Sequence, residues 1–370
     1  MKILTITCHA VQNHGACLQA YALSHYLQTL GHDVEIIDYR PDGLYGGYKL
    51  LSCPNRYKRP FVLKLIYLTA KLPGRILSLP RRKVFKKFVN EYMSLTPQRH
   101  TSFEQLKSQP PKADLYICGS DQIWNTFFYT GTDRGFYLDF PTDGKRRISY
   151  AASFGYSTIR NGYEDFVKSE ISQLDAVTVR EESGLKMLSG MGIEGQMAVD
   201  SVFLLSKTNW EELCKYTKKP SEKYVLVYDF EDSDLIEYLA KLYAKQKGVK
   251  VYSIGARRLK YADKCFTKSG PIQFLSLVKN AECVIGNSFH GILFSIIFER
   301  DFFVVRRNDG LNARMEDLLK RYDLSHRMIV SHLDDNALLE HVDFNHVNDK
   351  LASNIDSTKQ FLAEQIKLAE

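Results

Sequence analysis

Residues 283–298 read CVIGNSFHGILFSIIF and contain the pattern of a complete βα unit. An apolar, β-prone start is followed by a polar turn and then by an apolar run that begins at His290, which predicts a buried strand followed by a buried helix. Amide N–H groups at a helix start bind anions, and a histidine there can also move a proton. Asn287, Ser288, His290 and Gly291 are therefore predicted to form an anion site.

The same alternation of strands and helices recurs along the chain. Strands are predicted at residues 2–7, 33–39, 114–118, 148–154, 176–180 and 197–200, and again at 223–230, 250–254, 282–285 and 302–305. Helices are predicted at residues 15–30, 234–247, 271–279 and 288–298. Strands separated by helices indicate βαβ units and mostly parallel sheets. We therefore predict an α/β fold with two halves that face a cleft, with ligands at the carboxyl ends of the strands.

The predicted domain boundaries follow a polar stretch at residues 204–221, which is interpreted as the crossing between the halves. An N-terminal domain is expected at 1–205 and a C-terminal domain at 206–347. Residues 348–370 are expected to form a last helix that packs back on the N-terminal domain.

Composition narrows the class of protein. The 370 residues are 44% hydrophobic and 25% charged, as in a globular chain. The seven cysteines are scattered without a C-x-x-C pair, which argues against a disulfide framework or a metal site and favours a reducing cytoplasm. No apolar stretch is long enough to span a bilayer, and the first residues resemble a strand rather than a secretory signal.

A basic segment interrupts the N-terminal half. Residues 56–90 contain eleven lysines and arginines and no acidic residue, with apolar residues interleaved. This composition fits either the solvated face of a helical pair or contact with an anionic membrane surface. Nucleic acid is not expected as a partner, because the sequence shows no recognised nucleic-acid-binding motif.

Two strand ends in the N-terminal half offer polar groups to a ligand. Asn13, His14 and Gly15 follow the first strand, where Asn13 has the alternative use of capping the next helix. Residues 117–125, ICGSDQIWN, follow a later strand. Asp121 in this segment can accept a proton from a sugar hydroxyl or hold the sugar by hydrogen bonds. Trp124 offers a flat face to a sugar ring or fills the core, and both uses stay open.

Further strand ends complete the predicted cleft. Ser153 lies in a small-residue stretch, and Arg180 ends a strand, where a guanidinium can clamp a carboxylate or phosphate. The alternative for Arg180 is a salt bridge with a neighbouring acid. Arg306 and Arg307 follow the last strand and are candidates for extra positive charge at the same edge. The chain shows no nucleophile-elbow motif and no Ser-His-Asp order, so hydrolase chemistry is not favoured.

Together these motifs resemble the polysaccharide pyruvyl transferase family, over roughly residues 3–310. The matching residues are Asn13-His14-Gly15-Ala16 with Leu18-Gln19-Ala20-Tyr21-Ala22-Leu23, Gly119-Ser120-Asp121-Gln122-Ile123-Trp124-Asn125, Ser153-Phe154-Gly155, Val179-Arg180-Glu181, Asp200-Ser201-Val202-Phe203-Leu204-Leu205, and Ser288-Phe289-His290-Gly291 with Phe294-Ser295. The resemblance implies a glycosyltransferase-B-like architecture with two Rossmann-like domains around the cleft. It also implies transfer of the pyruvyl group of phosphoenolpyruvate, a co-substrate, to sugar hydroxyls without a further cofactor.

The resemblance also implies roles for the candidate residues. His290 and Asp121 would be catalytic, as a proton donor or phosphate ligand and as a base or acceptor-sugar ligand. The C-terminal domain would hold phosphoenolpyruvate and the N-terminal domain the acceptor. Phosphoenolpyruvate would be bound by Arg180, Asn287, Ser288, His290 and Gly291, and the acceptor sugar by Asn13, His14, Gly15, Ser120, Gln122, Trp124 and Ser153.

We therefore expect a cytoplasmic enzyme, peripheral at the inner face of the plasma membrane, that forms a 4,6-ketal on a hexose of a lipid-linked capsule or exopolysaccharide precursor. Ser288 departs from better characterised members, which resemble one another in carrying arginine at this position. The Ser-Phe-His-Gly sequence resembles another branch of the family. Two alternatives stay open: a glycosyltransferase that uses a nucleotide sugar, and a non-catalytic glycan-binding protein with a degenerate site.

Overall fold

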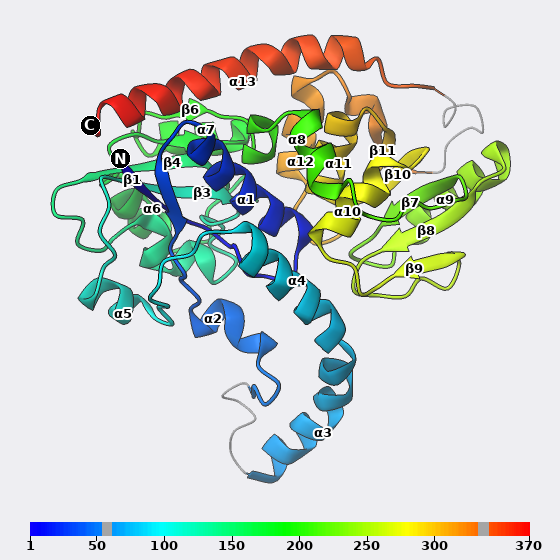
Figure 1. Ribbon diagram of the computed structural model, residues 1–370, viewed down its shortest axis with the longest axis horizontal. Coiled ribbons are helices and arrows are strands. Elements are labelled where there is room, and N and C mark those ends of the chain that lie inside the picture. The colour runs from blue at the N-terminus through cyan, green and yellow to red at the C-terminus, as the bar shows by residue number, and fades with distance from the viewer. Residues whose placement is uncertain (54–60, 332–339) are drawn as a thin grey trace.

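The computed structural model describes residues 1–53, 61–331 and 340–370 and contains two parallel six-stranded sheets, one in each half of the chain (Figure 1). The N-terminal sheet has the order β2-β1-β3-β4-β5-β6, with β1 (Lys2–Ile6), β2 (Asp33–Ile36), β3 (Leu115–Asp121), β4 (Arg146–Ala152), β5 (Thr178–Val179) and β6 (Gln196–Met197). The C-terminal sheet has the order β12-β11-β10-β7-β8-β9, with β7 (Tyr224–Tyr228), β8 (Lys250–Ile254), β9 (Lys264–Phe266), β10 (Cys283–Gly286), β11 (Asp301–Val305) and β12 (Met328–Ile329). The predicted α/β class with two parallel sheets is confirmed.

Helices connect the strands and surround both sheets. The α-helices are α1 (His14–Thr29), α2 (Asp42–Tyr45), α3 (Phe61–Leu77), α4 (Leu79–Tyr92), α5 (Phe103–Ser108), α6 (Glu164–Ile171), α7 (Glu182–Gly190), α8 (Lys207–Cys214), α9 (Asp234–Lys247), α10 (Pro271–Lys279), α11 (Phe289–Phe298), α12 (Ala313–Arg321) and α13 (Phe344–Lys367). Short 3-10 turns are η1 (Gly46–Tyr48), η3 (Thr130–Thr132), η4 (Arg134–Tyr137), η5 (Ser201–Leu204) and η6 (Ser325–Arg327). Among these described elements, no helix is both long and apolar enough to cross a membrane.

Each sheet has a point at which the strand order reverses. In the N-terminal sheet β1 lies between β2 and β3, and in the C-terminal sheet β7 lies between β10 and β8. Connections leave such a point toward opposite faces of the sheet, so a crevice opens at the carboxyl ends of the two central strands. The unit at 283–298 forms β10 and α11 at one of these points, and residues 117–125 begin in β3 at the other.

The two halves share an apolar core. Leu18 of α1 belongs to the same buried cluster as Phe274 of α10 and Phe289 of α11. Helix α13 extends over both halves (Figure 1). Its first turns join this shared cluster, and its last turns pack against β1 and the second half of α1 through Leu362. The Arg146 side chain donates to Gln365 Oε1 over 3.0 and 2.6 Å, which fastens the end of α13 to the N-terminal sheet.

The sequence interpretation missed several elements. The stretch at 204–221 contains helix α8, which begins with a reciprocal capping box between Ser206 and Asn209 and buries Trp210. Helix α12 was also not predicted. Strands β9 and β12 were not predicted because two or three strand residues carry too little periodicity to stand out. The basic segment forms α3 and α4, whereas its residues Arg56, Lys58 and Arg59 lie outside the described residues.

Candidate active site

A buried ion network occupies the carboxyl edge of the N-terminal sheet, with Arg180 at its centre. The Arg180 side chain is 1% exposed, and its Nη1 donates to Asp200 Oδ2 over 2.5 Å. Its Nη2 lies 3.4 Å from Asp121 Oδ1, and its Nε lies 3.7 Å from Glu181 Oε2. Three carboxylates therefore surround the one guanidinium of Arg180. Of the two uses predicted for Arg180, the structure shows the salt bridge with neighbouring acids.

The charges in this network shift one another's pKa values. Burial alone would lower the pKa of Arg180, but Asp200, Asp121 and Glu181 outweigh burial and raise it. Burial alone would raise the pKa of Asp121, yet the positive charge of Arg180 and its neighbours brings the net shift below the ordinary value. Arg180 and Asp121 are therefore both charged at neutral pH, which keeps the network intact.

His290 faces this network from the C-terminal half. Ser288 caps helix α11 by accepting a hydrogen bond from the Gly291 N–H over 3.2 Å, which places His290 in the first turn. His290 Nε2 lies 3.7 Å from Asp200 Oδ2, too far for a hydrogen bond, and has no partner elsewhere in the described structure. Burial, reinforced by the nearby arginines, lowers the pKa of His290 to about 4, although Asp200 and Asp121 oppose this. At neutral pH the imidazole is uncharged, and its buried Nε2 is without a hydrogen-bond partner among the described residues.

Arg314 was not predicted from the sequence and joins the same cluster from helix α12. Its guanidinium lies 5.2 Å from the centre of the Phe289 ring. The guanidinium of Arg180 lies 4.5 Å from the centre of the same ring. The Gln122 side-chain oxygen, oriented toward Arg314, accepts from Nη1 over 2.6 Å. Burial, followed by repulsion from Arg180, lowers the pKa of Arg314 to about 10, so the side chain stays charged. Arg314 lies well beyond the end of β11, and strand-end reasoning therefore could not find it.

The Asn13-His14-Gly15 motif connects the two halves. Asn13 caps α1 by accepting a hydrogen bond from the Ala16 N–H over 3.3 Å. Helix capping was the predicted alternative to ligand binding for this residue. His14 is buried, with Nδ1 2.9 Å from the Tyr228 hydroxyl and Nε2 3.2 Å from the Ser269 carbonyl oxygen. The motif therefore seats the start of α1 on the C-terminal half, which leaves the buried His14 ring no face for a sugar.

Gly15 lies directly against the ring of His290. A Cβ atom at this position would come within 2.1 Å of both Cγ and Nδ1 of His290, far inside van der Waals contact. Only glycine allows α1 and α11 to approach this closely, so Gly15 limits the positions open to the imidazole.

The predicted acceptor residues after β3 and β4 have different environments. Ser120 and Ser153 are buried and donate to carboxylates, Ser120 to Asp200 Oδ2 over 3.2 Å and Ser153 to Glu181 Oε1 over 2.8 Å. The Trp124 indole is fully buried and stacks on Tyr137. The prediction that Trp124 offers a face to a sugar ring is therefore corrected, because core packing encloses the ring.

Exposed aromatic rings do follow the same motif. Phe127, Phe128 and Tyr129 are 46%, 45% and 40% exposed, and the Phe127 ring lies 4.5 Å from that of Tyr156. The Tyr156 hydroxyl donates to the Asp309 carbonyl oxygen of the C-terminal half over 2.9 Å. The sequence interpretation did not include these rings among the candidate ligand-binding residues, although three consecutive aromatic residues after a polar strand end could have indicated them.

The remaining predicted residues hold the turns around the site. Asn287 Nδ2 donates to Asp229 Oδ1 over 3.0 Å, and Asn287 Oδ1 accepts from the Phe230 N–H over 2.9 Å, so the side chain links β7 to β10. Arg306 pairs with Glu316, and Arg307 pairs with Asp309. The charges of Arg306 and Arg307 are thus engaged outside the network around Arg180.

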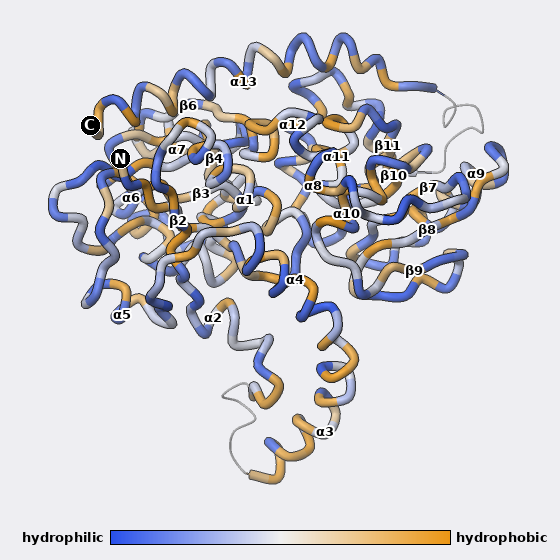
Figure 2. The backbone as a smooth tube through the Cα atoms, in the orientation of Figure 1, coloured by the Kyte–Doolittle hydropathy of each residue, from blue (hydrophilic) through white to orange (hydrophobic). Residues whose placement is uncertain are grey.

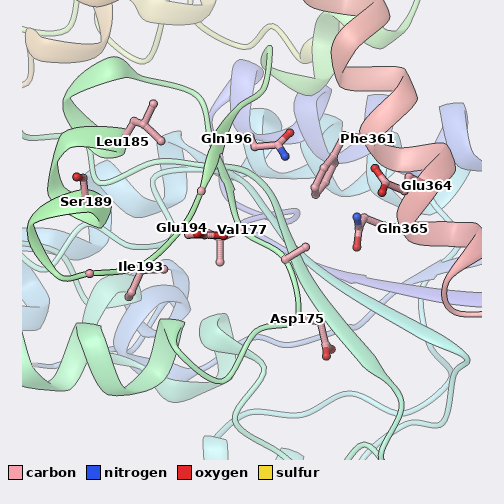
Figure 3. A pocket seen from close by; sticks show the side chains of 13 residues that line it. Asp175, Val177, Leu185, Ser189, Ile193, Glu194, Gln196, Phe361, Glu364 and Gln365 are labelled. Atoms are coloured by element: carbon pink, nitrogen blue, oxygen red, sulfur yellow. The ribbon is translucent and has the colours of Figure 1, made fainter.

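A separate cavity of about 810 Å³ lies between α7 and α13 (Figure 3). Its walls include the residues immediately before β5 and β6, so it sits at the amino ends of these strands, away from the network. Asp175, Glu194 and Glu364 line it, and no lysine or arginine does. Such a wall does not suit a phosphate or carboxylate ligand.

A sequence family relationship extends over most of the chain. The family model for polysaccharide pyruvyl transferase matches residues 13–309. The chain belongs to this family. As a member of the polysaccharide pyruvyl transferase family it is a transferase, and the matched range contains all the strand-end motifs from Asn13 to Gly291. Arg314 lies just beyond this range. No curated protein matches the chain.

Solved structures resemble the chain at low sequence identity. A UDP-GlcNAc 2-epimerase from Neisseria meningitidis, bound to UDP-GlcNAc, has a TM-score of 0.51 and 8% identity, with 99% of each chain covered. UGT89C1 of Arabidopsis thaliana has a TM-score of 0.48 and 9% identity, with 98% of this chain and 99% of that chain covered. This pyruvyl transferase family member therefore has the two-domain GT-B fold, and the comparison shows the fold alone.

Proposed function

We propose that this protein transfers the pyruvyl group of phosphoenolpyruvate to two hydroxyls of a hexose, forming a 4,6-ketal on a lipid-linked capsule or exopolysaccharide precursor. The observation that carries the proposal is the unused, buried Nε2 of His290 beside the carboxylates of Asp200 and Asp121. Family membership supplies the reaction class.

The reaction requires proton movement at three atoms. The methylene carbon of phosphoenolpyruvate gains a proton, and C2 becomes cationic and accepts the first sugar oxygen, whose proton leaves. Phosphate then departs with the C2–O bond electrons, and the second hydroxyl adds to C2 and loses its proton. The products are one ketal and one inorganic phosphate. The chain must therefore hold an anion, donate a proton and accept protons.

In this proposal Arg314 and the start of α11 hold the anionic co-substrate. Arg180 is already compensated by three acids and instead positions Asp121 and Asp200. Arg314 lies over Phe289, the residue after Ser288, and supplies the positive charge that Ser288 does not. A guanidinium held against a buried ring suits a planar carboxylate or a phosphate.

His290 is the proposed proton-transfer group, and its protonation depends on the ligand. Its pKa of about 4 leaves the free imidazole neutral and able to accept a hydroxyl proton. The negative charges of bound phosphoenolpyruvate would raise this pKa and allow His290 to protonate the methylene carbon. Asp121, charged at the end of β3, is the proposed base or sugar ligand on the acceptor side. Phe127 and Tyr156 are the proposed stacking surface for the sugar.

Phosphate release tests the proposal directly. Purified protein incubated with phosphoenolpyruvate and candidate lipid-linked sugars should release phosphate only when the acceptor is present. The product should gain the mass of one pyruvyl ketal. His290→Gln should abolish both signals while the variant remains folded by circular dichroism. If a nucleotide sugar raises thermal stability and phosphoenolpyruvate does not, the glycosyltransferase alternative replaces this proposal. Glycan binding with no product would indicate the non-catalytic alternative.

A further inference from the structure

Helix α3 has an unusual environment for a helix of its length. It extends away from the body of the protein and has no buried residue (Figure 1). Hydrophobic residues nevertheless run along it (Figure 2). Phe61, Val62, Leu63, Leu65, Ile66, Ile76 and Leu77 are all exposed, Phe61 to 71% and Leu77 to 77%. Contiguous exposed apolar surface of this kind marks a site of contact with a partner or a membrane.

The charged residues of α3 gather on one face of the helix, where Leu68 borders them and Arg75 already donates to the carbonyl oxygens of Leu50 and Ser52. Lys64, Lys71 and Arg75 are separated by seven and four positions, which places all three on one narrow face of the helix. Residues 61–90 include no aspartate or glutamate. A helix with a broad apolar face and a cationic stripe is typical of segments that lie in the plane of a membrane interface.

Helix α4 holds this arm at a defined place on the protein. Phe85, Phe88 and Val89 are buried in the core shared by the two halves. The Arg81 guanidinium donates to the carbonyl oxygen of Gln12 over 3.3 Å and lies 4.9 Å from the Phe85 ring centre. The exposed face of α3 is thus an extension of an anchored helix.

The base of the arm adds a basic pocket. A cavity of about 280 Å³ lies between α4 and the residues after β1 and β2, lined by the tyrosine rings of Tyr45 and Tyr48 and by four basic residues, with no acidic one. Those four are Arg40, Lys49, Arg82 and Lys86. Arg40 pairs with Asp38 and Lys49 pairs with Asp42, so Arg82 and Lys86 are the residues of this pocket that would attract anionic headgroups.

We propose that α3 docks on an anionic phospholipid bilayer, with its apolar face among the acyl chains and its lysines at the lipid phosphates. Charge complementarity favours an anionic bilayer over a second copy of the protein. Two copies of the arm would bring only cations together between residues 61 and 90, whereas anionic lipid neutralises them. This docking proposal does not depend on the proposed pyruvyl transfer, because it is argued only from the residues of α3 and α4.

Vesicle flotation with the full chain tests this docking. The protein should float with phosphatidylcholine vesicles that contain about 30 mol% phosphatidylglycerol and remain unbound with pure phosphatidylcholine. Raising the salt from about 0.1 M to about 0.5 M should reduce binding several-fold, because the Debye length shortens. Equal binding to neutral vesicles, or no binding to either, would overturn the proposal.

Paired variants separate the apolar and the electrostatic contributions. Leu65→Asp with Ile66→Asp should reduce vesicle affinity by about tenfold or more, because both exposed side chains lose their place among acyl chains. Lys64→Glu with Lys71→Glu should reduce it by a similar factor. Matched controls are Tyr216→Asp with Val330→Asp, exposed apolar residues elsewhere, and Lys245→Glu with Lys247→Glu on α9.

The controls should bind as the parent protein does, and all variants should keep the parent's melting temperature. Light scattering of the free protein supplies a second measurement. The free protein could instead form a dimer that dissociates in the variant Leu65→Asp with Ile66→Asp. If the protein also fails to bind vesicles, the apolar face of α3 contacts a second copy, and membrane docking is overturned.

Discussion

Gly15 and His290, which are far apart in the sequence, lie in direct contact across the two halves of the protein. A Cβ atom on Gly15 would come within 2.1 Å of the His290 ring, so the glycine at the start of α1 restricts the imidazole at the start of α11. This contact joins two motifs at the two points of strand-order reversal. It makes the proposed proton-transfer group dependent on how the halves pack.

Gly15→Ala should therefore impair turnover. The added methyl group forces His290 or α1 to move, and overpacking of this kind costs about 1–3 kcal/mol of unfolding free energy. A displacement of about 1 Å at a reacting group can reduce the rate by about 100-fold. Steady-state kinetics and denaturant unfolding should be measured beside Gly190→Ala, where a Cβ atom meets no atom within 4 Å. Full turnover in Gly15→Ala would show that the contact does not position His290.

The pH dependence of kcat/KM should reveal the depressed pKa of His290. Because this pKa is about 4, the free imidazole stays neutral as the pH falls from 8 to 5. We expect the His290-dependent part of kcat/KM to be flat over that range and to fall below about pH 5. A limb centred near pH 6.5 that disappears in His290→Gln would contradict the buried environment. His32→Gln, at a partly exposed histidine, is the matched control.

Arg314→Met should weaken the binding of phosphoenolpyruvate while retaining the fold. The substitution removes a buried guanidinium whose pKa is already lowered, so the free energy of unfolding should change by no more than about 1 kcal/mol. The KM for phosphoenolpyruvate should rise by about tenfold or more, since a charge-assisted hydrogen bond contributes about 1.5–3 kcal/mol. Arg306→Met, at a side chain paired with Glu316, should leave KM near the parent value. An unchanged KM in Arg314→Met would remove Arg314 from the proposed anion site.

Trp124→Phe and Phe127→Ala should have opposite effects on stability and on acceptor binding. Trp124 is fully buried, so its truncation should cost about 1–3 kcal/mol of unfolding free energy and leave the acceptor KM unchanged. Phe127 is 46% exposed, so its loss should raise the acceptor KM with a stability change below about 0.5 kcal/mol. Urea unfolding and acceptor kinetics measure the two effects. The reverse pattern would restore Trp124 as the sugar-facing ring.

His14 should make the stability of the protein depend on pH. Burial lowers its pKa to about 3, well below 6.5 for an unfolded chain, so the unfolded state takes up the proton first as the pH falls. The free energy of unfolding should be highest above pH 6.5 and should decrease toward pH 4 by up to about 1.4 kcal/mol per pH unit for this group. Urea titrations at several pH values should show a shallower slope for His14→Gln. Parallel curves for the parent and the variant would indicate that His14 is not buried in solution.

Sequence patterns predicted much of the fold because they are local. Helices α9 and α10 and strand β8 begin and end where the pattern indicates, since apolar periodicity and capping residues define such elements. Polar residues at strand ends likewise identified Asp121, Arg180 and His290 as neighbours, because the carboxyl ends of parallel strands meet at one edge. The sequence therefore predicted that these residues would come together, and their functional roles stay a prediction.

The roles of particular side chains required the tertiary structure. Trp124 is buried and Phe127 exposed, although the two are three residues apart, because packing against Tyr137 covers only one of them. Arg314 reaches the network from a helix that the sequence interpretation did not include. The exposure of α3 also depends on what covers it, which no helical period reports.

The order of residues along the chain thus determined the two α/β halves and the edge at which they meet, because strand and helix periodicity are properties of neighbouring residues. Tertiary packing alone determined that Arg180 is compensated by acids, that His290 is neutral with a free nitrogen, and that Gly15 restricts it. Charge compensation, desolvation and close approach depend on distances between segments that are remote in sequence, and only the folded chain sets those distances.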